Sequence, residues 1–421
     1  MRKGYGWFIL SVAATLLAGV PRAVADPASL ADAAKWLEDE SHRLIRASRR
    51  TMKDGAAAFP PQVGIGYEAF WLRDFAYTLE GSVDSYSDKE LLDASRLFIR
   101  SCNADGAGVD CVAFDGRPIY QPGYGTMGDN PVADGSQFTV AVVWHTYRKT
   151  RDAAFFKEVI DPLVKTMKAV PRNPQTKLVH IKPDGYDRCP YGFTDSVRQA
   201  GDVLFCSLLY VEAGHRLAEL LNATGRADEA TAWNAEADAV AGSVREVFWD
   251  PQVGLFRAAT IRCKEHDIWG SAFAVYLGVA SEGQSTAIAR YFRDHYSEIV
   301  QRGQIRHLPA SVYWEACSTP RDTYQNGGYW ATPTGWFVYA LDRADPKLAD
   351  QTARDLVADF QAGGACEWVL GEKRQLPGYL ASACLPLAGI RAMMDHRQSH
   401  SVKAKQASFV TPSDAEGSGR D

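Results

Sequence analysis

Helical periodicity recurs along almost the whole chain, and it is the sequence feature that most limits the possible folds. Apolar residues return every three or four positions, as Leu204, Leu208 and Val211 do, and similar segments follow one another between residues 28 and 396. Capping residues mark several starts, for example Asp345 before Pro346. We expect twelve helices, at 28–48, 70–80, 87–102, 135–149, 153–169, 198–222, 225–248, 267–279, 285–298, 328–342, 346–361 and 378–396.

The connections between these helices alternate between short and long. The long connections are rich in Gly, Pro and aromatic residues, and they lie at 51–69, 103–134, 170–197, 250–266, 300–327 and 362–377. Six helical hairpins of this kind can close into a double ring whose long connections open on one face. We therefore predict an all-α fold, an (α/α)6 barrel, with short strands in the long loops (178–181 and 253–256, for example) and a pocket on that face. No strand–helix–strand alternation is visible, which argues against a parallel-sheet fold.

The two ends of the chain differ from its middle. Residues 1–25 carry cations before an apolar run of 13 residues, FILSVAATLLAGV, and end in the small-residue pattern Ala-Val-Ala. This pattern predicts a secretory signal peptide, with a membrane anchor as the alternative, although 13 residues are short for a bilayer. We expect a secreted or periplasmic protein that leaves the membrane after cleavage, a catalytic domain at 26–397, and a disordered polar tail at 398–421.

Charge and cysteine content exclude some classes of function. The net charge is −5 without a basic stripe, so we expect no nucleic-acid partner. The eight cysteines show no CxxC spacing, which argues against a structural zinc site, and we expect no metal and no cofactor. Cys102 and Cys111 flank a short Gly-rich loop and form the most plausible disulfide in an exported chain. Nothing in the sequence indicates an oligomeric state.

Two segments at the predicted pocket face combine aromatic rings with polar groups. In the first, Tyr67 and Trp71 precede Arg73 and Asp74, which could form a helix-start ion pair or hold sugar hydroxyls with donors and acceptors. The second, residues 322–336, could be aromatic core around a turn, but its amides would be costly to bury unpaired. Its aromatic and amide side chains suit a carbohydrate, and they are Tyr324, Gln325, Asn326 and Trp330.

Two acidic residues are candidates for catalysis. Asp195 lies at a loop-to-helix junction, where it could cap a helix or act as a general acid whose pKa is raised by aromatic walls. Glu367 precedes Trp368 in a Gly-rich loop of the same predicted face and is a candidate general base. Two carboxyl groups on opposite sides of a pocket are what glycoside hydrolysis requires. Trp314–Glu315 and Asp134–Gln137 are weaker candidates that could line the rim or have no role.

Four of these segments resemble one known superfamily. Residues 324–330, YQNGGYW, are similar to the YxNGGxW signature of neutral invertases and debranching-type glucosidases, and residues 71–74, WLRD, to a WxRD segment of glucoamylase-like enzymes. Residues 194–196, TDS, and 366–368, CEW, resemble the segments that carry the general acid and general base of neutral invertases. The four occur in the family's order across residues 67 to about 385, so the chain resembles the six-hairpin glycosidases.

The resemblance implies an (α/α)6 barrel and an inverting glycoside hydrolase with Asp195 as general acid and Glu367 as general base. It also implies a sugar site, which we expect to contain Tyr67, Trp71, Arg73, Asp74, Arg198, Tyr324, Gln325, Asn326, Trp330 and Trp368. The chain departs from the family pattern in two places, and the second leaves the sugar undefined. Cys366 stands where the family often has proline, and Val197–Arg198 replaces an aromatic pair of the invertases.

We therefore predict a glycoside hydrolase that acts on a carbohydrate substrate. Polysaccharide lyases and sugar epimerases also use α/α barrels, and a protein that binds sugar without turnover is a third possibility. Fold-level likeness by itself does not decide among these functions.

Overall fold

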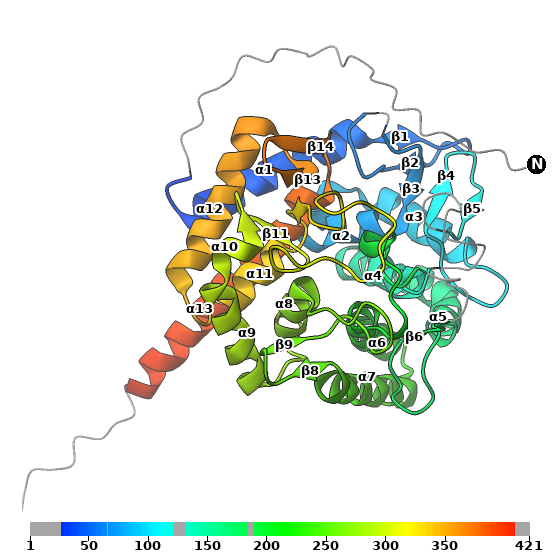
Figure 1. Cartoon of the computed structure of the whole chain (residues 1–421). Helices are drawn as coiled ribbons and strands as arrows, with labels where there is room; N and C mark the ends of the chain where they lie inside the picture. The colour runs from blue at the N-terminus through cyan, green and yellow to red at the C-terminus, as the bar shows by residue number, and fades with distance from the viewer. Residues whose placement is uncertain (1–26, 65, 122–131, 184–188, 409–421) are drawn as a thin grey trace, which may run out of the picture.

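The computed structural model describes residues 27–64, 66–121, 132–183 and 189–408, and helices dominate it (Figure 1). All twelve predicted helices are present in this part of the chain, together with one further short helix, α10. The helices are α1 (Leu30–Ser48), α2 (Leu72–Ser82), α3 (Asp88–Arg100), α4 (Gly135–Thr150), α5 (Ala153–Lys168), α6 (Leu204–Ala223), α7 (Ala227–Val247), α8 (Ile268–Tyr276), α9 (Glu282–Asp294), α10 (Tyr296–Ile299), α11 (Thr334–Leu341), α12 (Pro346–Gly363) and α13 (Ala381–Ser408).

Side-chain caps fix the starts of several outer helices. Ser29, Ser87 and Ser281 each accept a bond from the third helical residue, whose own side chain accepts one from the cap backbone. Asp345 accepts a bond from the backbone of Leu348 at the start of α12. These bonds satisfy backbone donors that the first helical turn leaves unpaired, which is why short polar residues define these boundaries.

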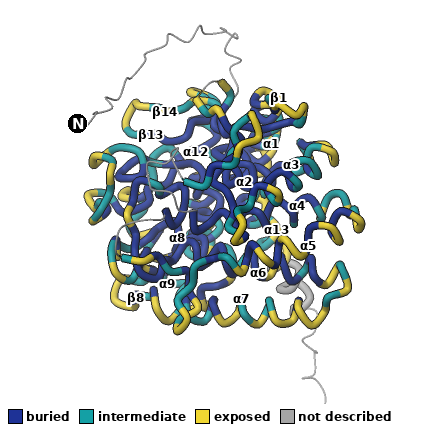
Figure 2. The backbone as a smooth tube through the Cα atoms, turned by 90° about the vertical axis from the view of Figure 1, so that its right-hand side faces the viewer, coloured by how far each residue is buried: buried dark blue, intermediate teal, exposed yellow. Residues whose placement is uncertain are grey.

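The helices fall into two classes by burial. Most residues are buried on every face of four helices, α2, α6, α8 and α11. Four others bury one face and expose the opposite face, and these are α1, α3, α9 and α12 (Figure 2). Contacts among the inner helices run from α2 to α4, α6, α8, α11 and α13, and from α13 back to α2. A helix that is apolar on every side must have protein on every side, so these elements surround the core.

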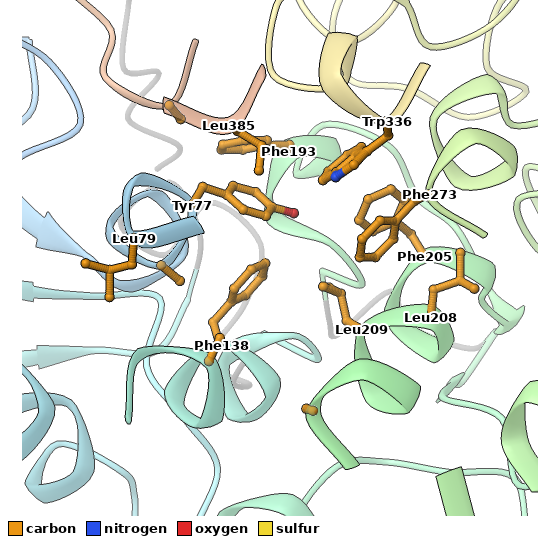
Figure 3. Close-up of a cluster of buried hydrophobic side chains, with 14 of the residues drawn as sticks. Tyr77, Leu79, Phe138, Phe193, Phe205, Leu208, Leu209, Phe273, Trp336 and Leu385 are labelled. Atoms are coloured by element: carbon orange, nitrogen blue, oxygen red, sulfur yellow. The ribbon is translucent and has the colours of Figure 1, made fainter. Parts of the chain in front are cut away.

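One aromatic cluster joins all of these inner helices (Figure 3). Tyr77 of α2, Phe138 of α4 and Phe205 of α6 face Phe273 of α8 and Trp336 of α11. Leu385 of α13 lies beside them, and Phe193 covers the cluster from the 3-10 helix η3 (Gly192–Thr194). The rings pack at centroid distances of 4.6 Å for Phe273 and Trp336 and 5.5 Å for Tyr77 and Phe193. The core therefore extends up to the loops that carry the candidate catalytic residues.

Short strands occupy the long connections. The predicted strands at 178–181 and 253–256 correspond to β6 (His180–Ile181) and β9 (Leu255–Phe256). The others are β1 (Arg50–Thr51), β2 (Ala57–Ala58), β3 (Ala69–Trp71), β4 (Cys111–Ala113), β5 (Pro118–Ile119), β7 (Gly201–Asp202), β8 (Trp249–Asp250), β10 (Val300–Gln301), β11 (Gln304–Arg306), β12 (Tyr329–Trp330), β13 (Cys366–Leu370) and β14 (Lys373–Pro377). Strands β10 to β14 form one antiparallel sheet in sequential order.

Two predicted helix starts, at residues 198 and 328, lie six residues too early. Residues 198–203 precede α6 in an extended path that pairs β7 with β6, and residues 329–330 form β12 before α11 begins. Gly201 adopts a φ of +90°, a left-handed conformation that a right-handed helix does not use. Apolar residues in both stretches extend the helical pattern by chance, while backbone pairing to a distant segment decides the structure.

Two further expectations are corrected. Cys102 and Cys111 form no disulfide: the Cys102 thiol bonds the Phe98 carbonyl, while Cys111 is buried on β4, and none of the eight cysteines is paired. Helix α13 continues to Ser408, so residues 398–408 are helical, since Ala, Lys and Gln in this stretch are good helix formers.

The predicted signal peptide at 1–25 and the tail beyond 408 lie outside the described residues. No described helix has the length and apolar character needed to cross a bilayer.

Candidate active site

Three connections from distant parts of the chain meet above the aromatic core. The first contains η3 and Asp195, the second is the loop 322–328 that leads into β12, and the third is β13 with Glu367. Strand pairing joins the last two, because Trp330 lies opposite Trp368 across β12 and β13. The sheet therefore places residues that are far apart in sequence beside one another.

Asp195 is held by an amide from the second connection. Its Oδ1 accepts a bond of 2.7 Å from Nε2 of Gln325, and its side chain is only partly exposed. Burial raises the pKa of Asp195 to about 6, although the Gln325 bond and the Arg73 charge oppose this rise. Asp195 does not cap the start of α6, which begins at Leu204 after Val203; it ends η3, where its backbone N–H donates to the Gly192 carbonyl.

Glu367 is almost fully buried, with 2% of its surface exposed. Tyr67 donates a bond of 2.7 Å to its Oε1. Burial raises the pKa of Glu367 to about 8, the Tyr67 bond opposes the rise, and the charges of Asp74 and Asp195 add to it. A buried carboxyl group without a cation beside it favours its protonated form.

The two carboxyl groups are close enough for the charge of Asp195 to act on Glu367. Asp195 raises the pKa of Glu367, and both of them, with Asp74, raise the pKa of Tyr324 after burial, which is the largest cause. We call Asp74, Asp195 and Glu367 the carboxyl site. The structure thus brings together both acids that the sequence singled out.

Asp74 supplies the third carboxyl group, from the start of α2. It is 3% exposed and accepts a short hydrogen bond from the Tyr379 hydroxyl. Burial raises the pKa of Asp74 to about 6, against the effects of Tyr379 and Arg73. Adjacent in sequence, Arg73 and Asp74 do not form the expected ion pair with each other.

Arg73 is instead locked between two other aspartates. Its Nε and Nη2 donate to the two oxygens of Asp134 at 2.7 and 2.8 Å, and its Nη1 and Nη2 donate to Asp110 at 3.3 Å. Four of the five guanidinium N–H groups are used in this way. Asp134 also accepts a bond of 2.8 Å from the Gly192 backbone, so the ion cluster anchors η3 and with it Asp195.

Aromatic rings border the carboxyl site. Tyr67 packs edge-to-face on Trp71 at 4.7 Å, and Tyr324 lies 5.2 Å from Trp330 and 6.4 Å from Trp368. Phe193 approaches Trp330 at 5.9 Å and connects this border to the core cluster of Figure 3. Flat apolar faces beside carboxyl groups suit a sugar ring, whose C–H face packs on aromatics while its hydroxyls form hydrogen bonds.

The loop 322–328 holds this arrangement through its backbone. Tyr324 has a φ of +44°, which is uncommon for a residue with a bulky side chain and marks local strain. A Cβ on Gly328 would lie 2.5 Å from the Tyr324 carbonyl oxygen and 2.9 Å from the Trp368 ring. Glycine is therefore required where this loop meets Trp368.

The remaining predicted residues support the loop or lie outside it. The Asn326 amide accepts a bond from the Trp314 backbone and donates one to the Thr319 carbonyl, so it closes the turn. The Arg198 side chain is exposed, and its backbone pairs with Ala316. Of the weaker candidates, Trp314 donates to the Gln325 carbonyl at 3.0 Å, so it braces the loop.

Sequence reasoning missed three participants. Asp110 and Tyr379 were not singled out, and Ser196 was noted only as the neighbour of Asp195. Asp110 carried a usable signal, because an acid between Val109 and Cys111 is a charge inside an apolar run. Tyr379 carried no such signal. In the described part of the chain, no group of three or more metal-ligating side chains is arranged to hold a metal ion.

Comparison with known proteins identifies the fold. No family model and no curated protein matches the chain. Among solved structures, the GH63 mannosylglycerate hydrolase from Thermus thermophilus in complex with glucose superposes with a TM-score of 0.61 at 18% identity, over 84% of this chain and 99% of that one. A rhamnosidase from Klebsiella oxytoca with rhamnose bound gives a TM-score of 0.59 at 14% identity, over 88% and 64%.

A GH78 rhamnosidase from a Bacillus species gives a TM-score of 0.54 at 16% identity, over 87% of this chain and 35% of that one. At 14–18% identity, and over 84–88% of this chain, these likenesses show that it shares its fold with these solved structures.

Proposed function

We propose that this protein is a glycoside hydrolase with an (α/α)6 barrel. The observation that carries the proposal is the meeting of Asp195 and Glu367, two carboxyl groups with raised pKa values, beside the aromatic border. Acid–base cleavage of a glycosidic bond requires at least two carboxyl groups at the site, one that donates a proton and one that accepts a proton. The likeness to glycosidase folds and the cyclic contacts of the inner helices support it.

The reaction is hydrolysis with inversion at the anomeric carbon. Asp195 donates its proton to the glycosidic oxygen as the C–O bond breaks, and the bonding electron pair stays with that oxygen. Glu367 removes a proton from a water molecule, and the water oxygen bonds to the anomeric carbon from the opposite face. One proton leaves Asp195 and one arrives on Glu367, so exchange with solvent restores both groups for the next turnover.

A second assignment exchanges the two roles. The pKa of Glu367 is about 8 and that of Asp195 is about 6, so near pH 7 the substrate-free protein carries its proton mainly on Glu367. This order favours Glu367 as the acid and Asp195 as the base. Inverting geometry accommodates either assignment, because it places one carboxyl group on each side of the sugar.

Charge at the carboxyl site favours an uncharged sugar. Asp74, Asp195 and Glu367 are acidic, and among the described residues the cation that acts on them most directly, Arg73, is already bound by Asp110 and Asp134. A uronate would bring a further negative charge to these three groups, which disfavours the lyase alternative. The sugar would contact Tyr67, Trp71, Tyr324 and Trp368, whereas Trp330, which was expected to bind sugar, is 1% exposed and supports Tyr324 from the core.

We also propose that the protein is exported. The first 25 residues have the composition of a signal peptide, so we place the enzyme in the periplasm or outside the cell. We propose no cofactor, since proton transfer between two carboxyl groups and water requires none.

The test is hydrolysis of a glycoside panel followed by proton NMR, with glucosides, mannosides and rhamnosides of both anomeric configurations. We expect one sugar class to be cleaved, with the opposite anomer released first, and we expect Asp195→Asn and Glu367→Gln to lose at least about a hundredfold in kcat/KM. Full activity in either folded variant would refute the assignment of the two acids. Release of an unsaturated sugar would instead identify a lyase, and binding without turnover would identify a sugar-binding protein.

A further inference from the structure

Resting on the function proposed above, we propose that Gln325 is a positioning residue that fixes which oxygen of Asp195 carries the proton. The residue was expected to bind sugar, but both ends of its side-chain amide are engaged by the protein. Gln325 is 1% exposed. Its contacts define its orientation without ambiguity, and that orientation constrains Asp195.

Ser196 determines which way the Gln325 amide faces. The Ser196 backbone N–H donates to Oε1 of Gln325 at 2.8 Å, and the Ser196 hydroxyl donates to the same oxygen at 2.6 Å. A backbone N–H can only donate, so the group facing it must be the carbonyl oxygen. The NH₂ end of Gln325 therefore points at Asp195.

The NH₂ end then constrains the protonation of Asp195. It donates to Oδ1 of Asp195 at 2.7 Å, and an amide NH₂ has hydrogens to give and no lone pair to offer in return. A proton placed on Oδ1 would meet these hydrogens. The acidic proton of Asp195 is consequently carried by Oδ2, the oxygen that does not face Gln325.

The surrounding loop keeps Gln325 in this position. Trp314 Nε1 donates to the Gln325 carbonyl at 3.0 Å, and the strained backbone of Tyr324 immediately precedes it. Ser196 follows Asp195 directly, so one dipeptide supplies both the carboxyl group and the donors that orient its partner amide. Preorganisation of this kind places an acid without rearrangement during the reaction.

Proton delivery follows from this geometry. Asp195 gives the Oδ2 proton to the glycosidic oxygen, the C–O bond breaks, and the carboxylate that remains keeps its Oδ1 bond to Gln325. That bond stabilises the ionised form, so it also sets how readily the proton leaves. Gln325 acts through Asp195 and does not touch the reacting atoms.

The discriminating variants are Gln325→Met and Gln325→Glu. Methionine removes the hydrogen bond while keeping the length of the side chain, so we expect the pKa of Asp195 to rise by about one pH unit. Glutamate keeps the shape, but its second oxygen faces Oδ1 and a shared proton would sit between them, away from the substrate. We expect Gln325→Glu to raise the pKa further and to be the less active variant, whereas a merely structural role predicts that this isosteric change is the milder one.

The pKa values are measured by carbon-13 NMR titration of the full chain labelled at aspartate carboxyl carbons, with Asp195→Asn identifying the signal. Activity is measured on glucosyl, mannosyl and rhamnosyl fluorides of both anomeric configurations and on the matching methyl glycosides, because a fluoride leaves with less help from a general acid. We expect Gln325→Met to lose roughly tenfold to a hundredfold on the cleaved methyl glycoside and much less on the fluoride. Equal losses on both, or an unchanged Asp195 titration, would overturn the positioning role.

Asp195→Asn separates this proposal from the proposed function. If Asp195→Asn loses more activity on the methyl glycoside than on the fluoride and Gln325→Met does not, the acid is correctly assigned and only the positioning role fails. If Asp195→Asn is fully active on methyl glycosides, the assignment of the acid fails first. Ser196→Ala, which keeps the backbone donor, should raise the pKa of Asp195 by an intermediate amount and serves if the Gln325 variants do not fold.

Discussion

Trp330 on β12 lies directly opposite Trp368 on β13 in an antiparallel pair. This pairing connects the loop that holds Gln325 to the strand that holds Glu367. Gln325 in turn binds Asp195, so a short chain of contacts runs from one acid to the other through a sheet that covers the helical core. The relative position of the two acids depends on backbone pairing more than on any direct contact between them.

Gly328 tests this dependence. In Gly328→Ala, the new methyl group would meet the Tyr324 carbonyl oxygen at 2.5 Å and the Trp368 ring at 2.9 Å, so backbone must move. We expect the unfolding free energy to fall by about 1–3 kcal/mol. We also expect kcat/KM to fall by more than this loss of stability alone would cause. Gly283→Ala, where a Cβ meets nothing within 4 Å, is the matched control in denaturant titrations and should be neutral or stabilising. Equal behaviour of the two variants would contradict a steric requirement for glycine at 328.

The buried ion cluster around Arg73 should be essential for folding of this region. Arg73→Met would leave Asp110 and Asp134 buried without their cation, at a cost of about 3–5 kcal/mol in unfolding free energy. The Gly192 backbone would keep its bond to Asp134, yet η3 would lose the charge that fixes it. Arg100→Met, at an exposed pair with Asp54, should cost less than about 1 kcal/mol when both variants are compared in urea titrations. A small effect at Arg73 would argue against an anchoring role.

Tyr67→Phe distinguishes the two assignments of acid and base. The Tyr67 bond lowers the pKa of Glu367, so its loss should raise that pKa above about 8. If Glu367 is the base, the ionised fraction at pH 7 falls, and kcat/KM should drop roughly tenfold for each pH unit by which the pKa of Glu367 rises. If Glu367 is the acid, it stays protonated at pH 7 and the rate should change little. The pH profile of kcat/KM decides, with Tyr296→Phe, whose hydroxyl bonds Thr352 away from the carboxyl site, as the control.

The helical architecture could be predicted because its signal is local and long. Segments such as α6 and α12 repeat the 3.6-residue pattern over several turns, and α12 begins at a capping residue, Asp345. The sheet β10 to β14 was missed, because strands of two to five residues are too short to show an alternating pattern. Pairing between residues 330 and 368 is a property of the assembled loops.

The candidate site was predictable in part for the same reason. Asp195, Glu367 and the aromatic loop stand out as acids and amides beside tryptophan and glycine. The partner of Arg73 was mistaken because adjacency in sequence suggested Asp74, whereas side chains of consecutive helical residues diverge. Asp110 and Asp134 both reach the guanidinium from the single long connection between α3 and α4. Hydrogen-bond partners of this kind depend on where loops meet, which local patterns do not encode.

Glu367 should make the protein less stable as the pH rises. The pKa of Glu367 is about 8 in the folded chain and 4.5 for an ordinary glutamate, as in the unfolded chain, so the folded protein binds the proton more tightly. The contribution of Glu367 to the stability of the folded protein is therefore fully present below pH 4.5, and it is lost as the pH rises through 8. Glu367→Gln stays neutral throughout, so it should be more stable than the unmodified protein at pH 9, by on the order of 2–5 kcal/mol, and nearly equal at pH 4.5. Glu68→Gln removes the same charge from an exposed neighbour of Tyr67 and should show no such pH dependence in thermal unfolding scans. If Glu367→Gln and Glu68→Gln change the melting temperature alike at both pH values, the Glu367 carboxyl group does not carry its proton into the neutral range.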